Sequence, residues 1–219
     1  MNRPIVRAYL INTVGALLLG SSAGLYATPA QEWRFKVYLD DQPIGYHNFR
    51  LVPQGDGRRT IDINAQFDVK FLFFNAYSYR HDNTEQWQQR CLRSLNSSTN
   101  DNGKVSGIRG ELDGNRFFLD TGSERTALDG CVMSFAYWDP NILQADRLLN
   151  AQTGEYVGIE VQPQGQEQVP VRDRLVIANR YRLLADKAVI DLWYAADNGR
   201  WLALRSKTDS GRTLRYLID

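Results

Sequence analysis

The segment TIDINAQFDVKF (residues 60–71) alternates apolar and polar side chains more regularly than any other part of the sequence. All odd positions from Ile61 to Phe73 are apolar, whereas the even positions from Asp62 to Lys70 are polar. A period of two is typical of a β-strand with one face in a core and the other in water. The segment therefore predicts a half-buried strand of an antiparallel sheet.

The same alternation recurs on both sides of this segment. We expect further strands at 33–40 and 43–52, and a C-terminal meander at 174–184, 188–195, 200–206 and 213–218. Turns that contain glycine, which tolerates the positive φ of tight hairpins, are predicted at 102–103, 113–114, 198–199 and 210–211. Strands that follow one another without helical patterns between them favour an antiparallel sheet or barrel.

One short helix is expected after Asp139. This aspartate offers an N-cap, and Pro140 suits the first helical position. The following NILQADRLLN (141–150) places Ile142, Ala145 and Leu149 on one face. The stretch VQPQGQEQVPV (161–171) is rich in Gln and Pro and predicts a loop between strands, too short to link two domains.

The N-terminus has the pattern of a secretory signal. MNRPIVR is basic, residues 8–26 are largely apolar, and small residues follow, so that cleavage after Ala27 or Ala30 is predicted. The alternative is an uncleaved membrane anchor. No later segment approaches a membrane-spanning length, so we expect a periplasmic protein with a signal peptide at 1–27 and one β-rich domain at 31–219.

The charge balance argues against nucleic acid as a partner. Removing Arg3 and Arg7 with the signal from the 26 basic side chains leaves 24, against 25 acidic ones. Because Lys and Arg are not in excess and are scattered along the chain, binding to nucleic acid or to an anionic membrane surface is not expected.

The two cysteines, Cys91 and Cys131, are expected to form one disulfide, because an exported chain meets an oxidising compartment. Two buried free thiols and a redox site are the alternatives. No C-x-x-C pair supports the redox alternative.

Residues for catalysis are few. His81 lies close to Asp82 and Glu85, and a histidine beside carboxylates can act as a general base. It can equally be a solvated residue of a polar hairpin, and His47 in GYHNF faces either a cavity or the core. No metal-ligand spacing, phosphate loop or dinucleotide motif occurs, so neither a metal nor a cofactor is predicted.

Strict alternation fails after Lys70, where FLFF (71–74) makes both faces of the strand apolar. Three hypotheses compete: a corner of the core, the wall of a hydrophobic ligand cavity, and a membrane-surface patch. If the stretch lines a cavity, the candidate ligand-binding residues are Phe71, Phe73, Phe74, Tyr77, Tyr79 and Trp87.

The order of these elements resembles a known family. GYHNF, the segment from Trp87 to Cys91 followed by Thr99–Gly103, and the closing WY…GRW…L pattern are similar to uncharacterised exported bacterial proteins called domain of unknown function 6134. The P-I-G hairpin and the closing tryptophan strands also resemble a second family of unknown function. That likeness implies the half-open barrel of periplasmic lipoprotein carriers, a curved antiparallel sheet with one or two short helices. Neither resemblance assigns catalytic residues.

The leading hypothesis is a protein, more a binder than an enzyme, that binds or carries a lipid or another apolar small molecule on the concave side of the sheet. An envelope enzyme with a site near His81, Asp82 and Glu85 is the second hypothesis. A structural or assembly partner in the cell envelope is the third, and it predicts an exposed apolar patch on the outer face of the sheet.

Overall fold

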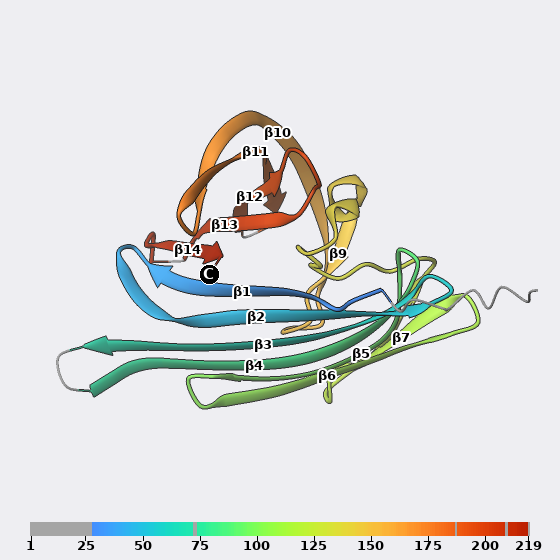
Figure 1. The fold of residues 1–219 in the computed structure, drawn as a ribbon. Coiled ribbons are helices and arrows are strands. Elements are labelled where there is room, and N and C mark those ends of the chain that lie inside the picture. Colours follow the sequence, from blue (N-terminus) through green and yellow to red (C-terminus); the bar gives the residue numbers. More distant parts are fainter. Residues whose placement is uncertain (1–27, 72–73, 187, 209, 219) are drawn as a thin grey trace, which may run out of the picture.

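The computed structural model describes residues 28–218 except 72–73, 187 and 209, with only the backbone of residues 71, 74 and 75. These residues form one antiparallel sheet of fourteen strands, drawn in Figure 1. The strands are β1 (Gln31–Leu39), β2 (Gln42–Gly55), β3 (Arg58–Phe71), β4 (Phe74–Gln88), β5 (Cys91–Asp101), β6 (Lys104–Asp113), β7 (Arg116–Asp120), β8 (Arg125–Asp129), β9 (Arg147–Leu149), β10 (Tyr156–Val171), β11 (Arg174–Ala185), β12 (Ala188–Ala195), β13 (Trp201–Lys207) and β14 (Thr213–Ile218).

The sheet consists of two meanders joined at one seam. From edge to edge the order is β8-β7-β6-β5-β4-β3-β2-β1-β14-β13-β12-β11-β10-β9. We call β1–β8 the first arm and β9–β14 the second arm. At the seam between them, Phe35 of β1 pairs with Ile218 of β14. Because β8 and β9 are the two edges, the described sheet is open, which confirms the predicted curved antiparallel fold.

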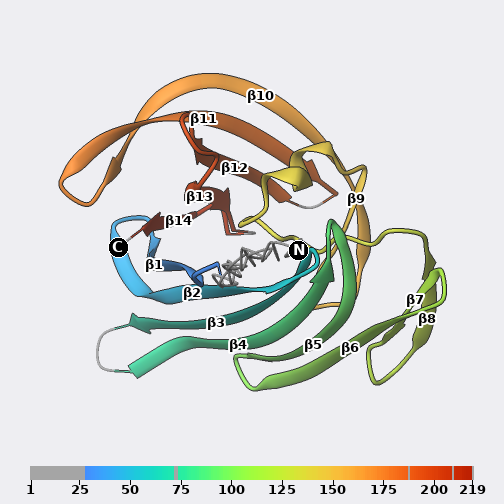
Figure 2. The same ribbon diagram turned by 45° about the vertical axis from the view of Figure 1, so that its right-hand side comes forward.

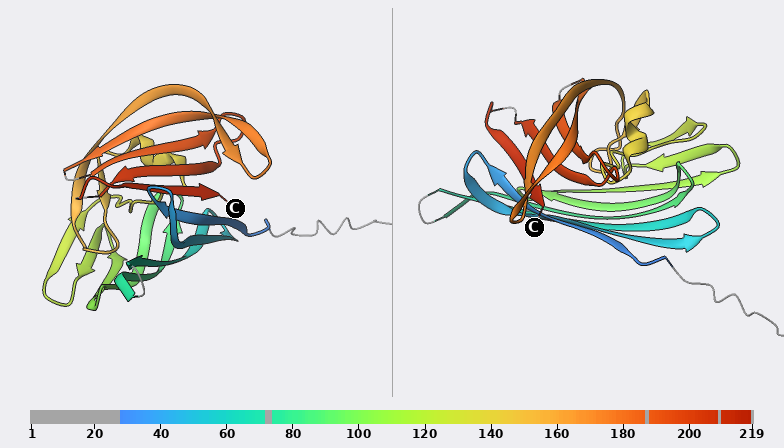
Figure 3. Two further views of the ribbon diagram at one scale, coloured as in Figure 1. Left: turned by 90° about the vertical axis from the view of Figure 1, so that its left-hand side faces the viewer. Right: turned by 45° about the horizontal axis from the view of Figure 1, so that its top comes forward.

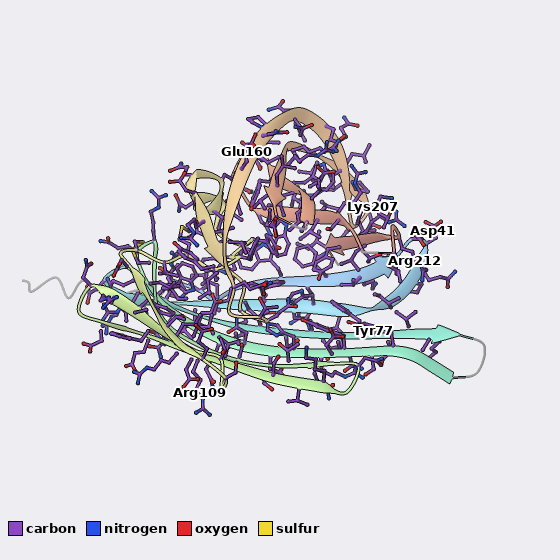
Figure 4. All side chains as sticks on the ribbon, turned by 180° about the vertical axis from the view of Figure 1, so that it is seen from behind. Asp41, Tyr77, Arg109, Glu160, Lys207 and Arg212 are labelled. Carbon is purple, nitrogen blue, oxygen red and sulfur yellow. A yellow bond between two sulfur atoms is a disulfide. The ribbon has the colours of Figure 1, made fainter. Side chains whose placement is uncertain are left out.

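The sheet curls so that the second arm lies over the first. Figures 2 and 3 show β10–β13 arching above β2–β5. The face turned toward the other arm is called the inner face, and it carries the main hydrophobic core. Strand alternation sends Ile61, Ala65 and Phe67 of β3 into this core, as the opening segment predicts. Side chains fill most of the space between the arms (Figure 4).

Residues 130–146, here called the crossing segment, connect β8 to β9 across the inner face. Its Val132, Ala136 and Trp138 are buried in the main core. The backbone amide of Leu92 in β5 donates to the carbonyl of Val132, and the Tyr194 hydroxyl of β12 donates to the carbonyl of Tyr137, each at 2.9 Å. The crossing segment therefore contacts both arms.

The predicted helix is shorter than expected. It is a single 3-10 helix, Pro140–Gln144, with Asp139 as its N-cap and Ala145 as its C-cap. The chain then becomes extended because Arg147–Leu149 pairs with Tyr156–Gly158 of β10 as an edge strand. Leu149 was expected on a helix face, and it is instead fully buried on β9.

The prediction of a loop at 161–171 is wrong, because these residues form the second half of β10. Val169 is the one buried side chain of this stretch, so the stretch lacks the apolar alternation that predicts the other strands. Its pairing with β11 supplies the strand structure instead, from Val161↔Leu183 to Val171↔Arg174.

The predicted disulfide is present. Cys91 and Cys131 are bonded and tie the start of β5 to the start of the crossing segment. The signal predicted at 1–27 lies outside the described residues. Within the described part of the chain, no helix has the length and apolar character needed to cross a membrane.

Candidate functional site

Strand β4 presents polar side chains to the inner face. Tyr79, His81, Asn83, Glu85 and Trp87 alternate inward and are at most 7% exposed. The residues between them point away from the core. The inward set is unusual because β3, which pairs with β4, sends apolar residues such as Ile61 and Ala65 to the same face opposite Glu85 and His81.

Two histidines stand on either side of Ala65. The register pairs His47 of β2 with Ala65 of β3, and Ala65 with His81 of β4. His47 Nδ1 lies 3.2 Å from the Tyr216 hydroxyl, and His81 Nδ1 lies 2.9 Å from Thr99 Oγ1. Burial lowers the pKa of His47 to about 3 and that of His81 to about 4. Both imidazoles are therefore neutral at cellular pH.

Glu85 is a buried carboxylate held by neutral donors. Its side chain accepts from Asn83 Nδ2 at 2.9 Å, from Trp87 Nε1 at 2.9 Å and from Ser134 Oγ at 3.1 Å. Burial raises the pKa of this carboxyl, and the three hydrogen bonds offset only part of that rise. The donor Ser134 belongs to the crossing segment, so two separate parts of the chain build this environment.

These side chains line an interior cavity of about 160 Å³ that is partly open to the surface. Its polar wall consists of His47, His81, Asn83, Glu85, Ser134, Asn150 and Gln152, and its apolar wall includes Phe49, Ile63, Phe135, Tyr137, Ala188 and Ile190. Two buried polar atoms of the wall, His47 Nε2 and Asn83 Oδ1, have no hydrogen-bond partner within the part of the chain that the structure describes. Such groups are costly in a folded protein unless a partner arrives from outside the chain.

The aromatic residues proposed as ligand-binding lie beside this cavity or outside the described side chains. Tyr79 stacks on Phe67 with the ring centroids 5.1 Å apart, and Trp87 meets Trp138 edge-on at 5.5 Å. Tyr77 is half-buried against the main core. Phe73 is outside the described residues, and of Phe71 and Phe74 only the backbone is described, as a pair that closes the β3–β4 hairpin.

The three weak catalytic candidates do not form one cluster. His81 and Glu85 both line the cavity, whereas Asp82 is exposed because alternation turns it to the outer face. The neighbour of the His81 ring is the hydroxyl of Thr99 rather than a carboxylate. The hypothesis of a histidine oriented by an acid therefore lacks its hydrogen bond in this geometry.

A second buried carboxylate, Asp191 of β12, lies on the outer face. Arg182 and Arg205 are its cross-strand neighbours on β11 and β13. Ion pairs join it to Arg180 at 2.8 Å, Arg182 at 2.9 Å and Arg205 at 2.8 Å. Burial raises the pKa of Asp191, but the three guanidinium hydrogen bonds outweigh it and lower that pKa to about 2.

The outer-face cluster extends to Trp193. The guanidinium groups of Arg180 and Arg205 both lie 5.3 Å from its ring centroid. The Trp193 indole donates to the carboxylate of Glu167 on β10. Around it, Val169, Ala178, Ala195 and Leu202 form a small second core under the arch of β10 and β11. The sequence analysis missed this cluster, although alternation within 188–195 places Asp191 and Trp193 on one face.

A third charged group lies where the β1–β2 and β13–β14 turns meet. Figure 4 shows Asp41, Lys207 and Arg212 together at this end of the molecule. Arg212 Nε donates to Asp40 Oδ2 at 2.8 Å, and Arg215 pairs with Asp41 at 2.8 Å. These side chains are largely exposed, so they hold the turns together across the seam without forming a buried site.

Comparison with solved structures shows the fold. A β-barrel-like protein of domain of unknown function DUF1849 from Brucella abortus has a TM-score of 0.63 and 12% identity, over 88% of this chain and 96% of that one. LprF from Mycobacterium bovis has a TM-score of 0.30 and 11% identity, over 86% of this chain and 83% of that one. Comparison with curated proteins gave no match. The model of the family described as "Domain of unknown function (DUF6134)" matches residues 35–219, so the chain belongs to that family, as its motifs predict.

Proposed function

We propose that the protein binds a small molecule with an apolar body and one polar group in the interior cavity. The observation that carries this proposal is the pair of buried, unpartnered atoms, His47 Nε2 and Asn83 Oδ1, in the wall of a cavity. A ligand that hydrogen-bonds to them would remove their desolvation penalty. Its apolar part would lie against Phe49, Phe135 and Ile190.

The volume restricts the ligand. Cavities that enclose drug-sized molecules measure about 300–1,000 Å³, whereas this one measures about 160 Å³. Trp87, Trp138 and Trp201 are among the side chains of the main core that fills the inner face. The part of the ligand that the cavity encloses is therefore smaller than the lipid expected from the sequence, because a long acyl chain held wholly inside would have to displace buried tryptophans.

The test fills the cavity without changing its polar wall. Ala188 lines the cavity, so Ala188→Leu should abolish binding, while Val189→Leu on the outer face of the same strand should leave it intact. Native mass spectrometry of protein purified from the periplasm should show a small bound mass in the wild type and in Val189→Leu only. A clean ligand-free mass, together with no NMR shift changes from a fragment library, would refute the proposal.

We also propose that the chain is exported to the periplasm and that its mature domain begins after the N-terminal signal. The pattern of residues 1–27 supports this, and so does the Cys91–Cys131 disulfide, which is typical of oxidising compartments. Mass spectrometry of the fractionated protein should find a mature N-terminus at Thr28 or Gln31. An intact N-terminus in the membrane fraction would favour the anchor instead.

A further inference from the structure

We infer that the ligand of this cavity carries a positively charged nitrogen, a step that rests on the proposed function. The starting observation is the carboxylate of Glu85, which is 1% exposed. Its three partners, Asn83, Trp87 and Ser134, are all neutral. Among the described residues, no Lys, Arg or His forms an ion pair with it at 4.0 Å or less. Buried carboxylates are ordinarily paired with a cation, so a positive group is missing here.

The orientation of the neighbouring groups suits a donor. Asn83 donates one of its two amide N–H groups to Glu85, and its Oδ1 is a buried acceptor without a partner among the described residues. Ser134 donates its only hydroxyl proton to Glu85 and keeps its lone pairs. The polar wall near Glu85 therefore offers acceptors, and an ammonium group carries up to three donors that match them.

Nothing else in the polar wall opposes a positive charge. His47 and His81 are the other titratable groups of that wall, and both are neutral at cellular pH because burial lowers the pKa of each. The apolar wall contributes the rings of Phe49, Phe135 and Tyr137. Aromatic faces attract cations, so these rings favour an ammonium over a neutral group of equal size.

The cavity volume sets the size of the probe. A space of about 160 Å³ accepts a short alkyl chain with one head group. We choose n-butylammonium and 1-butanol as probes, since they have the same carbon chain and differ in the charge of the head group. Binding of each to the mature protein would be measured at pH 7 by NMR shift titration.

The wild type should bind the amine at least about tenfold more tightly than the alcohol, which corresponds to about 1.4 kcal/mol. Glu85→Gln should remove this preference while the alcohol still binds. The matched control is Asp82→Asn, which removes a carboxylate from the outer face of the same strand and should keep the preference. The amine-to-alcohol ratio of the wild type is itself informative, so the test does not depend on whether Glu85→Gln folds.

Three results would contradict the inference in distinguishable ways. Equal binding of both probes to the wild type would refute the charged ligand and leave small-molecule binding in the cavity intact. Absence of binding by either probe, together with a ligand-free native mass, would refute the proposed function and the inference with it. A preference for the amine that persists in Glu85→Gln would show that Glu85 is not the group that recognises the positive charge.

Discussion

Two buried carboxylates on opposite faces of one sheet have opposite electrostatic surroundings. Asp191 is 5% exposed and Glu85 is 1% exposed, so burial alone does not separate them. Three guanidinium groups lower the pKa of Asp191 to about 2, whereas neutral donors leave the pKa of Glu85 raised. Asp191 is thus part of a complete ion cluster, whereas Glu85 is a carboxylate without a counter-charge among the described residues.

The difference shows which buried charge is structural and which is a candidate for recognition. Every oxygen of Asp191 is paired with arginines from two neighbouring strands, and the network fixes β11, β12 and β13 to one another. Glu85 faces a cavity whose wall has unpaired polar atoms. A buried group that the chain leaves incomplete is a stronger sign of a ligand than a group that it completes.

The largest expected effect is the loss of stability in acid. As the pH falls, buried groups on the inner face should reduce the free energy of unfolding before Asp191 on the outer face does. His47 and His81 have lowered pKa values when folded, so the unfolded chain takes up their protons first as the pH falls below about 6.5. Stability should drop by up to about 1.4 kcal/mol per pH unit for each histidine. Between pH 6.5 and pH 5, urea denaturation should therefore show a loss of up to about 4 kcal/mol.

Asp191 should contribute to this acid sensitivity only at lower pH. Its folded pKa is lowered to about 2, so its stabilisation is lost only as the pH falls below its ordinary value of 3.8.

The contribution of the histidines can be tested with His81→Gln. This substitution should halve the slope of the unfolding free energy against pH between pH 6.5 and pH 5. An unchanged slope in that variant would mean that His81 is not one of the titrating groups.

Asp191→Asn should be the most damaging of the proposed single substitutions. It leaves three guanidinium groups around a neutral amide, and breaking such a cluster costs about 3 kcal/mol, the lower end of the usual range because the arginines still reach water. The matched control is Asp129→Asn, which breaks an exposed pair with Arg116. It should change the free energy of unfolding by less than about 0.5 kcal/mol. Equal effects in the two variants would contradict the structural role of Asp191.

Arg205→Gln should have a smaller effect on the same cluster. Arg180 and Arg182 remain on Asp191, and the Arg205 side chain is 42% exposed, so its loss should cost about 1 kcal/mol. Addition of salt should narrow the difference from the wild type in urea titrations. A loss as large as that of Asp191→Asn would show that the cluster needs all three arginines.

Glu85→Gln should have the smallest effect at neutral pH and the opposite pH dependence. The raised pKa of Glu85 means that its ionisation opposes folding as the pH rises above about 4.5. Glutamine does not ionise, so at pH 8 the free energy of unfolding of the variant should equal that of the wild type or be higher by less than about 1 kcal/mol. A destabilisation of several kcal/mol there would mean that the neutral donors already satisfy the carboxylate.

The strands were predictable from the sequence where alternation and turns agree. The segment 60–71 and the meander from 174 to 218 have both signals, and their strands lie where expected. Residues 161–171 lack alternation because β10 is largely exposed on both faces, so only its pairing with β11 makes it a strand. The helix expected over 141–150 ends at Gln144 because edge pairing with β10 overrides the helical pattern.

The two carboxylate sites differ in how far the sequence could reveal them. Asp191 and its arginines are cross-strand neighbours in hairpins, so hairpin register alone could have assembled most of that cluster. In the segment around Glu85, both alternating sets are polar, and periodicity alone does not say which set points inward. Register with the apolar face of β3 decides that, and Ser134 comes from the distant crossing segment.

The seam between β1 and β14 has a consequence for the order in which the protein assembles. Hairpins within each arm close short loops. In contrast, residues 35–39 can pair with residues 214–218 only after all the intervening strands have been synthesised. Such long-range pairing is slow, because a large loop must close before its contacts form. During folding, the edge of β1 therefore stays unpaired until β14 has formed, and an open strand edge readily joins a foreign strand. Deleting 213–218 would leave two half-sheets with a permanently open edge each.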